Sequence, residues 1–194
     1  MFEILGYLKE SEERLLKHIT KSIEAFYDFS DGKFSDVKNS VVIVPPSKDA
    51  ITHYLKNNTV ILSAENPSLP GILSFDEYKR LLSSFENFKD IYTELNLCCS
   101  DFNFEKRTKE TLSLNRGILN SYIHGSEIFR DELSGVSYYT YKGHLVWIHD
   151  PLSVSQRHNL IKKMGFKGIF IRDVKMAADG NWDSLCGMKK ARSQ

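Results

Sequence analysis

Residues 138–185, YYTYKGHLVWIHDPLSVSQRHNLIKKMGFKGIFIRDVKMAADGNWDSL, are the most informative stretch of the chain. Polar and apolar side chains mix over residues 136–148 around a central Lys142-Gly143, which predicts a β-hairpin. Pro151 favours the first turn of a helix that runs to about Met164 and ends at a glycine. The apolar run Gly168–Ile171 then predicts a buried strand. A helix followed directly by a buried strand is typical of α/β proteins.

The N-terminal half shows the same alternation of strands and helices. Residues 3–7 predict a short strand, and residues 10–27 carry apolar side chains at helical spacing, which predicts an amphipathic helix. The β-branched run Val41–Val44 suits a parallel strand covered on both faces. Strand, helix and strand over this length form a βαβ unit. We expect a further strand at residues 58–63 and a helix near residues 112–124.

Composition and charge exclude several classes of protein. Twenty-six Lys and Arg balance 25 Asp and Glu, and the net charge of +1 gives no attraction to nucleic acid or acidic membranes, so we expect neither partner. No segment approaches the roughly 20 apolar residues of a membrane span. Cys98, Cys99 and Cys186 make neither a disulfide framework nor a zinc site, and the histidines lack metal-ligand spacing. We therefore expect no metal and no cofactor.

Five short segments stand in an order that is informative in itself. They are Leu5-Gly6-Tyr7-Leu8, residues 43–48 (IVPPSK), residues 71–77 (GILSFDE), Asp150-Pro151-Leu152-Ser153 followed by Arg157, and residues 168–172 (GIFIR). In this order they resemble the end of the barrel in the chitinase family, the family 18 glycoside hydrolases. The corresponding family patterns are M-x-Y-D, G-I-P-x-Y-G, G-x-x-x-Y-x-E, D-P-x-S-x-x-x-K and G-V-M-V-W.

The resemblance implies an α/β fold, in which part of a (β/α) barrel supplies a parallel sheet and carries an inserted α+β lobe. We expect one domain over residues 1–194. Residues 1–50 and 145–194 would form the barrel-derived β/α units, and residues 51–144 the inserted lobe. Only the last three β/α steps and the insertion are expected. The N-terminus lacks a signal peptide, which favours the cytoplasm by default, although the family is often secreted.

The same segments lack the chemistry that the resemblance would bring. The family relies on substrate assistance and needs one protonated Glu, with Asp and Tyr groups that orient the attacking acetamido oxygen. No D-x-x-D-x-D-x-E run is present, and Leu8, Ser47 and Arg172 stand where the family has Asp, Tyr and a floor Trp. A guanidinium lacks the flat apolar face on which a sugar ring stacks. We therefore expect no catalytic residue and an inactive relative.

Two candidate ligand-binding residues come from the resemblance. Tyr7, at a strand end, is either a retained sugar contact or a buried tyrosine with a satisfied hydroxyl. Glu77 either organises the insertion or serves as the third helical residue of a capping box that begins at Ser74, the N-cap of a helix over residues 75–85.

Three further candidates lie in the hairpin. Alternate residues of a strand share a face, so Tyr139 and Tyr141 point the same way and offer rings for stacking on sugars. Trp147 is the third candidate for such stacking. The alternative for Trp147 is packing in the core.

Three hypotheses about function follow. The first is a catalytically inactive chitinase-like protein that binds chitin or a related polysaccharide as a wall or matrix component. The second is an intracellular interaction or structural scaffold that binds no carbohydrate. The third is one part of an active chitinase that another chain completes. A parallel sheet of three strands has open edges, and the run Val41–Val44 is apolar, so we expect self-association or a protein partner.

Overall fold

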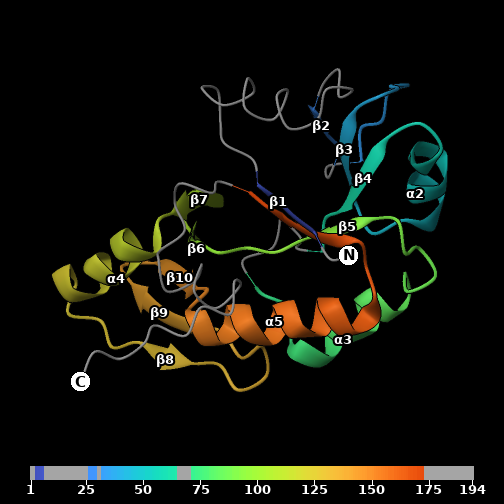
Figure 1. The fold of residues 1–194 in the computed structure, drawn as a ribbon. Helices are drawn as coiled ribbons and strands as arrows, with labels where there is room; N and C mark the ends of the chain where they lie inside the picture. Colours follow the sequence, from blue (N-terminus) through green and yellow to red (C-terminus); the bar gives the residue numbers. More distant parts are fainter. Residues whose placement is uncertain (1–2, 7–25, 30–31, 65–70, 173–194) are drawn as a thin grey trace, which may run out of the picture.

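The protein is described here by a computed structural model, which defines residues 3–6, 26–29, 32–64 and 71–172. Two sheets make up this part of the chain, one parallel and one antiparallel. In Figure 1 the long helix α5 (Pro151–Met164) runs beneath both, from the antiparallel lobe to the parallel sheet. Among the described residues, none of the helices is both long and apolar enough to cross a membrane.

The parallel sheet has six strands. They are β1 (Glu3–Gly6), β2 (Phe26–Asp28), β3 (Val41–Val44), β4 (Thr59–Leu62), β5 (Tyr92–Glu94) and β11 (Gly168–Ile171). Their spatial order is β1-β11-β5-β4-β3-β2, and every neighbouring pair is parallel. The strands β2, β3, β4, β5 and β11 lie side by side in their chain order, and β1 pairs with the other side of β11. The last strand thus lies beside the first, as in a barrel built from β/α units.

The two faces of this sheet belong to two separate apolar clusters. The outer face packs Val42, Val60 and Ile169 against the helices α2 (Lys48–Leu55), α3 (Phe75–Ser83) and α5. The inner face forms a separate apolar row of Val41, Ile43, Ile61, Tyr92 and Phe170. Strands buried on both faces must be apolar throughout, which explains why they read as continuous apolar runs.

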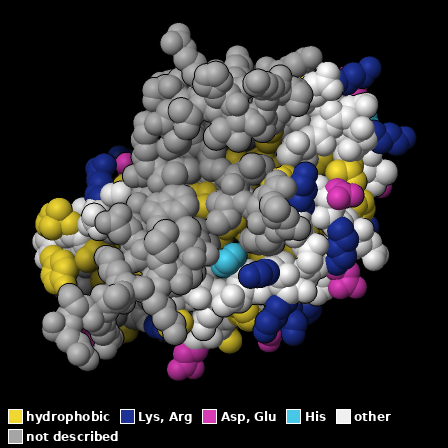
Figure 2. Space-filling view, in the orientation of Figure 1, with side chains coloured by type: hydrophobic (Ala, Val, Ile, Leu, Met, Phe, Trp, Pro, Cys, Tyr) yellow, Lys and Arg dark blue, Asp and Glu magenta, His cyan; other side chains and the backbone are white. Residues whose placement is uncertain are grey.

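The antiparallel lobe contains five strands and one helix. The strands are β6 (Cys99–Asn103), β7 (Thr108–Leu112), β8 (Phe129–Arg130), β9 (Ser137–Tyr141) and β10 (His144–Ile148), in the order β7-β6-β10-β9-β8. Helix α4 (Leu114–Ile123) packs on one face, over a core that contains Cys99, Tyr139 and Val146. The opposite side of α4 faces solvent, and hydrophobic side chains gather there at the left of Figure 2.

Local signals set the ends of the helices as the sequence predicts. Asp150 caps α5 by accepting a hydrogen bond from the Ser153 backbone N–H (2.9 Å), and Gly165 ends it at φ 76°. The capping box of α3 is also confirmed, since Ser74 and Glu77 bond to each other's backbone N–H groups. The hairpin around Lys142-Gly143 and the strands Val41–Val44 and Gly168–Ile171 are confirmed as well.

Other expectations need correction. Phe26 and Tyr27 belong to strand β2, not to the end of a helix, and residues 10–25 lie outside the described part. Strand β1 pairs with β11, and the strand that precedes the lobe is β5, so two of the five family-like segments were matched to the wrong strands. These are Leu5-Gly6-Tyr7-Leu8 and residues 43–48. Strand pairing depends on distant partners that short motifs do not encode.

The lobe also begins later than residue 51. Strands β4 and β5 extend the parallel sheet, and the antiparallel sheet runs from Cys99 to Ile148. The parallel sheet therefore has more strands than the three expected, because the buried runs at residues 59–62 and 92–94 pair with β3 and β11.

The contact between α4 and β6 depends on a glycine. A Cβ atom at Gly117 would lie 2.4 Å from the Cys99 Sγ. Burial raises the pKa of the Cys99 thiol to about 12, so this cysteine acts as a packing residue. We expect Gly117→Ala to lower the free energy of unfolding by roughly 1–2 kcal/mol, because overpacking outweighs the gain in helix propensity.

Urea denaturation measures this change. Gly71→Ala is the matched control, since the added methyl meets no atom within 4 Å there. In a Cys99→Ala background the cost of Gly117→Ala should shrink, and an unchanged cost would show that the Cys99 side chain is not the obstacle.

Stability should also depend on pH through His149, which is buried where β10 leads into α5. Burial, together with the charge of Arg157, lowers the pKa of His149 to about 3. The unfolded chain, with a histidine pKa near 6.5, binds more protons between these values, so stability is full above about pH 6.5 and falls as the pH drops. From pH 7 to pH 5 we expect a loss of roughly 2 kcal/mol.

His149→Leu should flatten this dependence in urea titrations at pH 7, 6 and 5. Burial also lowers the pKa of His158, which leaves a smaller slope of the same sign in the variant. Equal slopes in both proteins would contradict the assignment to His149.

Candidate functional site

Four polar residues meet at the carboxyl end of the parallel sheet, where barrel folds place their sites. Asp28 ends β2, Ser63 follows β4, Glu94 ends β5 and Arg172 follows β11. Strand alternation directs them to the inner face, since the three on β4, β5 and β11 come two residues after members of the inner apolar row. The inner row therefore carries a polar cluster at its carboxyl end.

Arg172 is the centre of this cluster. Its Nε donates to Glu94 Oε1 at 2.8 Å, and its Nη1 donates to Asp28 Oδ2 at 2.5 Å. A longer contact of 3.5 Å joins Arg172 Nη2 to Glu94 Oε2, which also accepts from the Ser63 hydroxyl at 3.0 Å. The Glu94 side chain is 10% exposed, and the side chains of Arg172 and Asp28 are about a third exposed. Both oxygens of Glu94 are thus engaged.

The electrostatics favour the charged form of Arg172. Burial alone would lower the pKa of its guanidinium, but the charges and hydrogen bonds of Glu94 and Asp28 outweigh burial and raise it. The guanidinium in turn favours the carboxylate forms of its partners. A carboxylate held in this way carries no proton to give to a leaving group.

The ion pair between Arg172 and Asp28 also shows that the parallel sheet is curled. From β11 to β2 the strand order takes four steps, through β5, β4 and β3. In a flat sheet four steps separate strands by roughly 19 Å, which two side chains cannot bridge. Because Arg172 reaches Asp28, the sheet curls until these two strand ends approach across its inner face.

The predicted ligand residues of the hairpin lie in different environments. Tyr139 is fully buried under α4 and its hydroxyl donates to the Gly117 carbonyl at 2.7 Å, so its ring has no exposed face for a sugar. Tyr141 shares that face, as expected, with a ring centroid 5.9 Å from that of Tyr139. Its hydroxyl donates to Asp101 at 2.9 Å, and the imidazoles of His124 and His144 stack on its ring. Both tyrosines thus serve the lobe core.

Trp147 lies on the other face of the hairpin. It stands opposite Tyr138 in the register of β9 and β10, with ring centroids 5.3 Å apart, and Phe129 on β8 lies 6.0 Å from Tyr138. Trp147 and Tyr138 are half-buried, and Phe129 is 51% exposed. These three rings, on three adjacent strands, form what we term the aromatic row.

The two candidates that came from the family resemblance, Glu77 and Tyr7, lie outside the hairpin. Glu77 is exposed and its carboxylate binds the Ser74 backbone N–H and hydroxyl, which also lower its pKa, so the capping role accounts for its contacts. Tyr7 lies outside the described residues. Asp28 and Glu94 were not predicted as site residues. Asp28 follows a segment with helical spacing, and Glu94 stands in a region of weak pattern, so sequence periodicity gave no signal for either.

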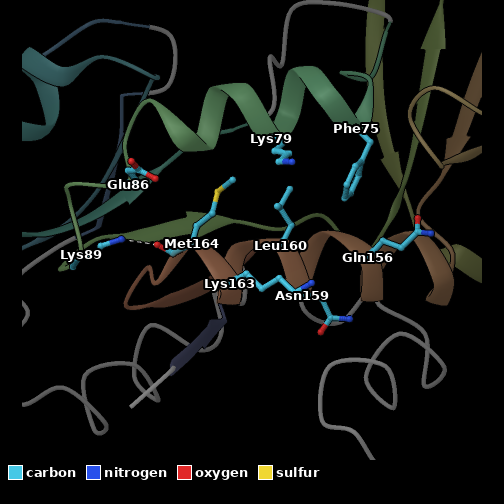
Figure 3. Close-up of a pocket in the computed structure, with 9 residues that line it drawn as sticks. All are labelled: Phe75, Lys79, Glu86, Lys89, Gln156, Asn159, Leu160, Lys163 and Met164. Carbon is cyan, nitrogen blue, oxygen red and sulfur yellow. Dashed lines mark hydrogen bonds between the residues drawn. The ribbon is translucent and has the colours of Figure 1, made fainter.

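A concavity lies between α3 and α5 on the outer surface. Its volume is about 490 Å³, and its lining comprises Phe75, Lys79, Glu86, Lys89, Gln156, Asn159, Leu160, Lys163 and Met164. Figure 3 shows Phe75 and Lys79 of α3 pointing toward Leu160 and Met164 of α5. Lys89 donates to the Met164 carbonyl at 2.6 Å and so satisfies the end of α5. We interpret this groove as a packing seam between helices.

Metal binding finds no support in the described ranges. Within them, no group of three His, Cys, Asp or Glu side chains is placed to hold a metal ion.

The Arg172 cluster should contribute to stability. Arg172→Met leaves Glu94 buried without its cation, and we expect the free energy of unfolding to fall by about 1–3 kcal/mol, less than for a fully buried pair because Arg172 is partly exposed. Arg172→Lys keeps the charge but loses the forked geometry and should lie between the two proteins. Guanidinium chloride is unsuitable because it screens ion pairs, so urea is the denaturant. A Met variant as stable as the wild type would contradict the described pairing.

Comparisons with known proteins address the fold. Neither a known sequence family nor a curated protein matches this chain. Solved structures do match. The spore cortex-lytic enzyme SleL of Bacillus megaterium aligns with a TM-score of 0.61 and 17% identity over 75% of this chain and 40% of that protein. SleL of Bacillus cereus gives 0.61 and 16% over 94% and 47%.

A chitinase of Chromobacterium violaceum gives a TM-score of 0.59 and 16% identity over 77% of this chain and 55% of that protein. This chain thus spans about half the length of these proteins. At such identities the likeness concerns the fold alone. The resemblance drawn from the sequence is confirmed at that level: the chain has the α/β, barrel-derived fold of the chitinase-like glycoside hydrolases.

Proposed function

We propose that this protein is a chitinase-like protein without hydrolase activity that binds chitin or a related polysaccharide. The fold provides the general class, and two features of the described residues support the finer statement. One is the state of the carboxylates at the carboxyl end of the parallel sheet. The other is the aromatic row on the lobe.

The loss of hydrolysis is supported chiefly by the Arg172 cluster. Glycoside hydrolysis needs a carboxyl group that carries a proton to the leaving oxygen. Among the described residues that end or directly follow the parallel strands, Asp28 and Glu94 supply the carboxylates, and both pair with Arg172. Glu94 also accepts from Ser63, so neither of its oxygens is left for a substrate. The arrangement therefore leaves both acids paired as carboxylates at the end of the sheet where barrel folds place their sites.

Polysaccharide binding is supported by the aromatic row. Sugar rings stack on flat apolar faces, and Phe129, Tyr138 and Trp147 place three rings side by side on the lobe face opposite α4. Tyr139 and Tyr141 are engaged in the core, so Trp147 is the predicted contact that the geometry favours.

We expect chitin oligosaccharides at millimolar concentration to quench the fluorescence of Trp147. A Trp182→Phe background leaves Trp147 as the sole tryptophan. In that background Tyr138→Ala should weaken binding about fivefold, which corresponds to roughly 1 kcal/mol per lost ring. Added salt should have little effect, since stacking involves no charge.

Phe34→Ala is the matched control, because Phe34 is an aromatic ring 52% exposed on another part of the chain, near Tyr54. The same preparations should release no product from chromogenic chitin-oligomer analogues. Equal binding by the Tyr138→Ala and parent proteins would remove the aromatic row as the ligand site. Turnover lost on substituting Glu94 would overturn the proposed inactivity.

The second candidate function is a protein-interaction scaffold. It is favoured by the exposed apolar side chains of α4, which lie away from the aromatic row. An absence of quenching together with defined self-assembly would favour this candidate over polysaccharide binding.

A further inference from the structure

Helix α4 carries an apolar stripe that faces solvent. Leu119, Tyr122 and Ile123 are 57%, 78% and 66% exposed. Their spacing of i, i+3 and i+4 puts them on one face of the helix, opposite the buried Leu114, Gly117 and Ser121. In Figure 2 this face forms the hydrophobic edge at the left of the molecule. We refer to the three exposed residues as the α4 stripe.

The size of the stripe indicates the strength of the contact that it can make. Three large side chains exposed by more than half present on the order of 300–400 Å² of surface, which is comparable to a large patch on a monomer. If a second copy covers it with the same surface, the total buried area is on the order of 600–800 Å², below the roughly 1,200 Å² at which standard stable interfaces begin. The stripe therefore suits a weak and reversible dimer.

Charge at the two ends of the stripe indicates the orientation. Arg116 lies three residues before Leu119 and continues the exposed face, and its ion pair with Glu110 is long, at 4.0 Å between two side chains that are each 65% exposed. Glu127 is exposed and follows the C-terminal end of α4, beyond a turn at Gly125 (φ 62°). About a twofold axis near the middle of the stripe, antiparallel packing brings Arg116 of each copy toward Glu127 of the other.

We propose that the α4 stripe is a self-association surface, on which two copies of this chain pack their α4 helices antiparallel. The contact has an apolar centre of Leu119, Tyr122 and Ile123, and the pairs between Arg116 and Glu127 at its ends set the orientation. The proposal is independent of polysaccharide binding, because the aromatic row lies on the opposite face of the lobe sheet.

Sedimentation velocity of the full chain tests this from roughly 5 to 500 µM, the range of a weak protein interface. The wild type should shift from monomer toward dimer as its concentration rises. Ile123→Lys should raise the dissociation constant at least tenfold (order of magnitude), since a twofold contact carries the substitution twice. The position is exposed, so folding should persist, which circular dichroism verifies.

Leu152→Lys is the matched control, because Leu152 is also 55% exposed but lies in the first turn of α5. It should leave the dissociation constant unchanged. Arg116→Glu and Glu127→Arg should each weaken the dimer, and the two together should restore it. Glu110→Gln, which removes the contact of Arg116 within the chain, should have no effect.

A wild type that stays monomeric over this range would overturn the proposal and leave the stripe to a different partner protein. A dimer that Ile123→Lys does not weaken, or that Leu152→Lys weakens equally, would overturn it as well. Loss of the dimer in the doubly charge-reversed protein would exclude the antiparallel arrangement.

Discussion

The ion pairs of Arg172 connect strand ends that are far apart in the sheet. Glu94 lies on the neighbouring strand β5, and Asp28 lies on β2, three strands further on. The contact requires the sheet to curl, and the curl gives it an inner face and an outer face. The inner face holds the apolar row and its polar cluster, while α2, α3 and α5 cover the outer face. The same contacts hold both acids as paired carboxylates, so the curl of the sheet and the proposed inactivity share one cause.

Polar contacts of helix α5 attach the lobe to this sheet. Asp150 lies two residues after the end of β10 and is the N-cap of α5, and its carboxylate accepts from the Ser153 backbone, from Ser137 and from Arg130. These bonds lower the pKa of Asp150 despite its burial. Further along α5, Arg157 donates to the carbonyls of Leu73 and Ser134. Helix α5 is therefore bonded to both parts of the structure, which fixes the aromatic row and the α4 stripe relative to the parallel sheet.

Local features of the fold could be predicted from the sequence, and pairings between distant residues could not. Pro151 and Gly165 mark the ends of α5, and Ser74 with Glu77 marks the start of α3, because caps depend on neighbouring residues. The alternation of side chains along a strand predicted that Tyr139 and Tyr141 share a face of the hairpin. It gave no indication that helix α4 covers that face. Strand β2 was hidden at the end of a segment with helical spacing. Its partner Arg172 lies 144 residues away, a separation on which periodicity carries no information.

Arg172 joins β2 to the far side of a curled sheet. A double-mutant cycle between Asp28→Asn and Arg172→Met, measured by urea denaturation, is the decisive test of this connection. We expect a coupling energy of about 0.5–2 kcal/mol, because the two side chains share one contact. A parallel cycle between Asp28→Asn and Lys167→Met should be additive, since Lys167 lies over the Tyr92 ring at the other end of the sheet. Additivity between Asp28 and Arg172 would show that the two side chains do not interact and that the sheet does not curl as described.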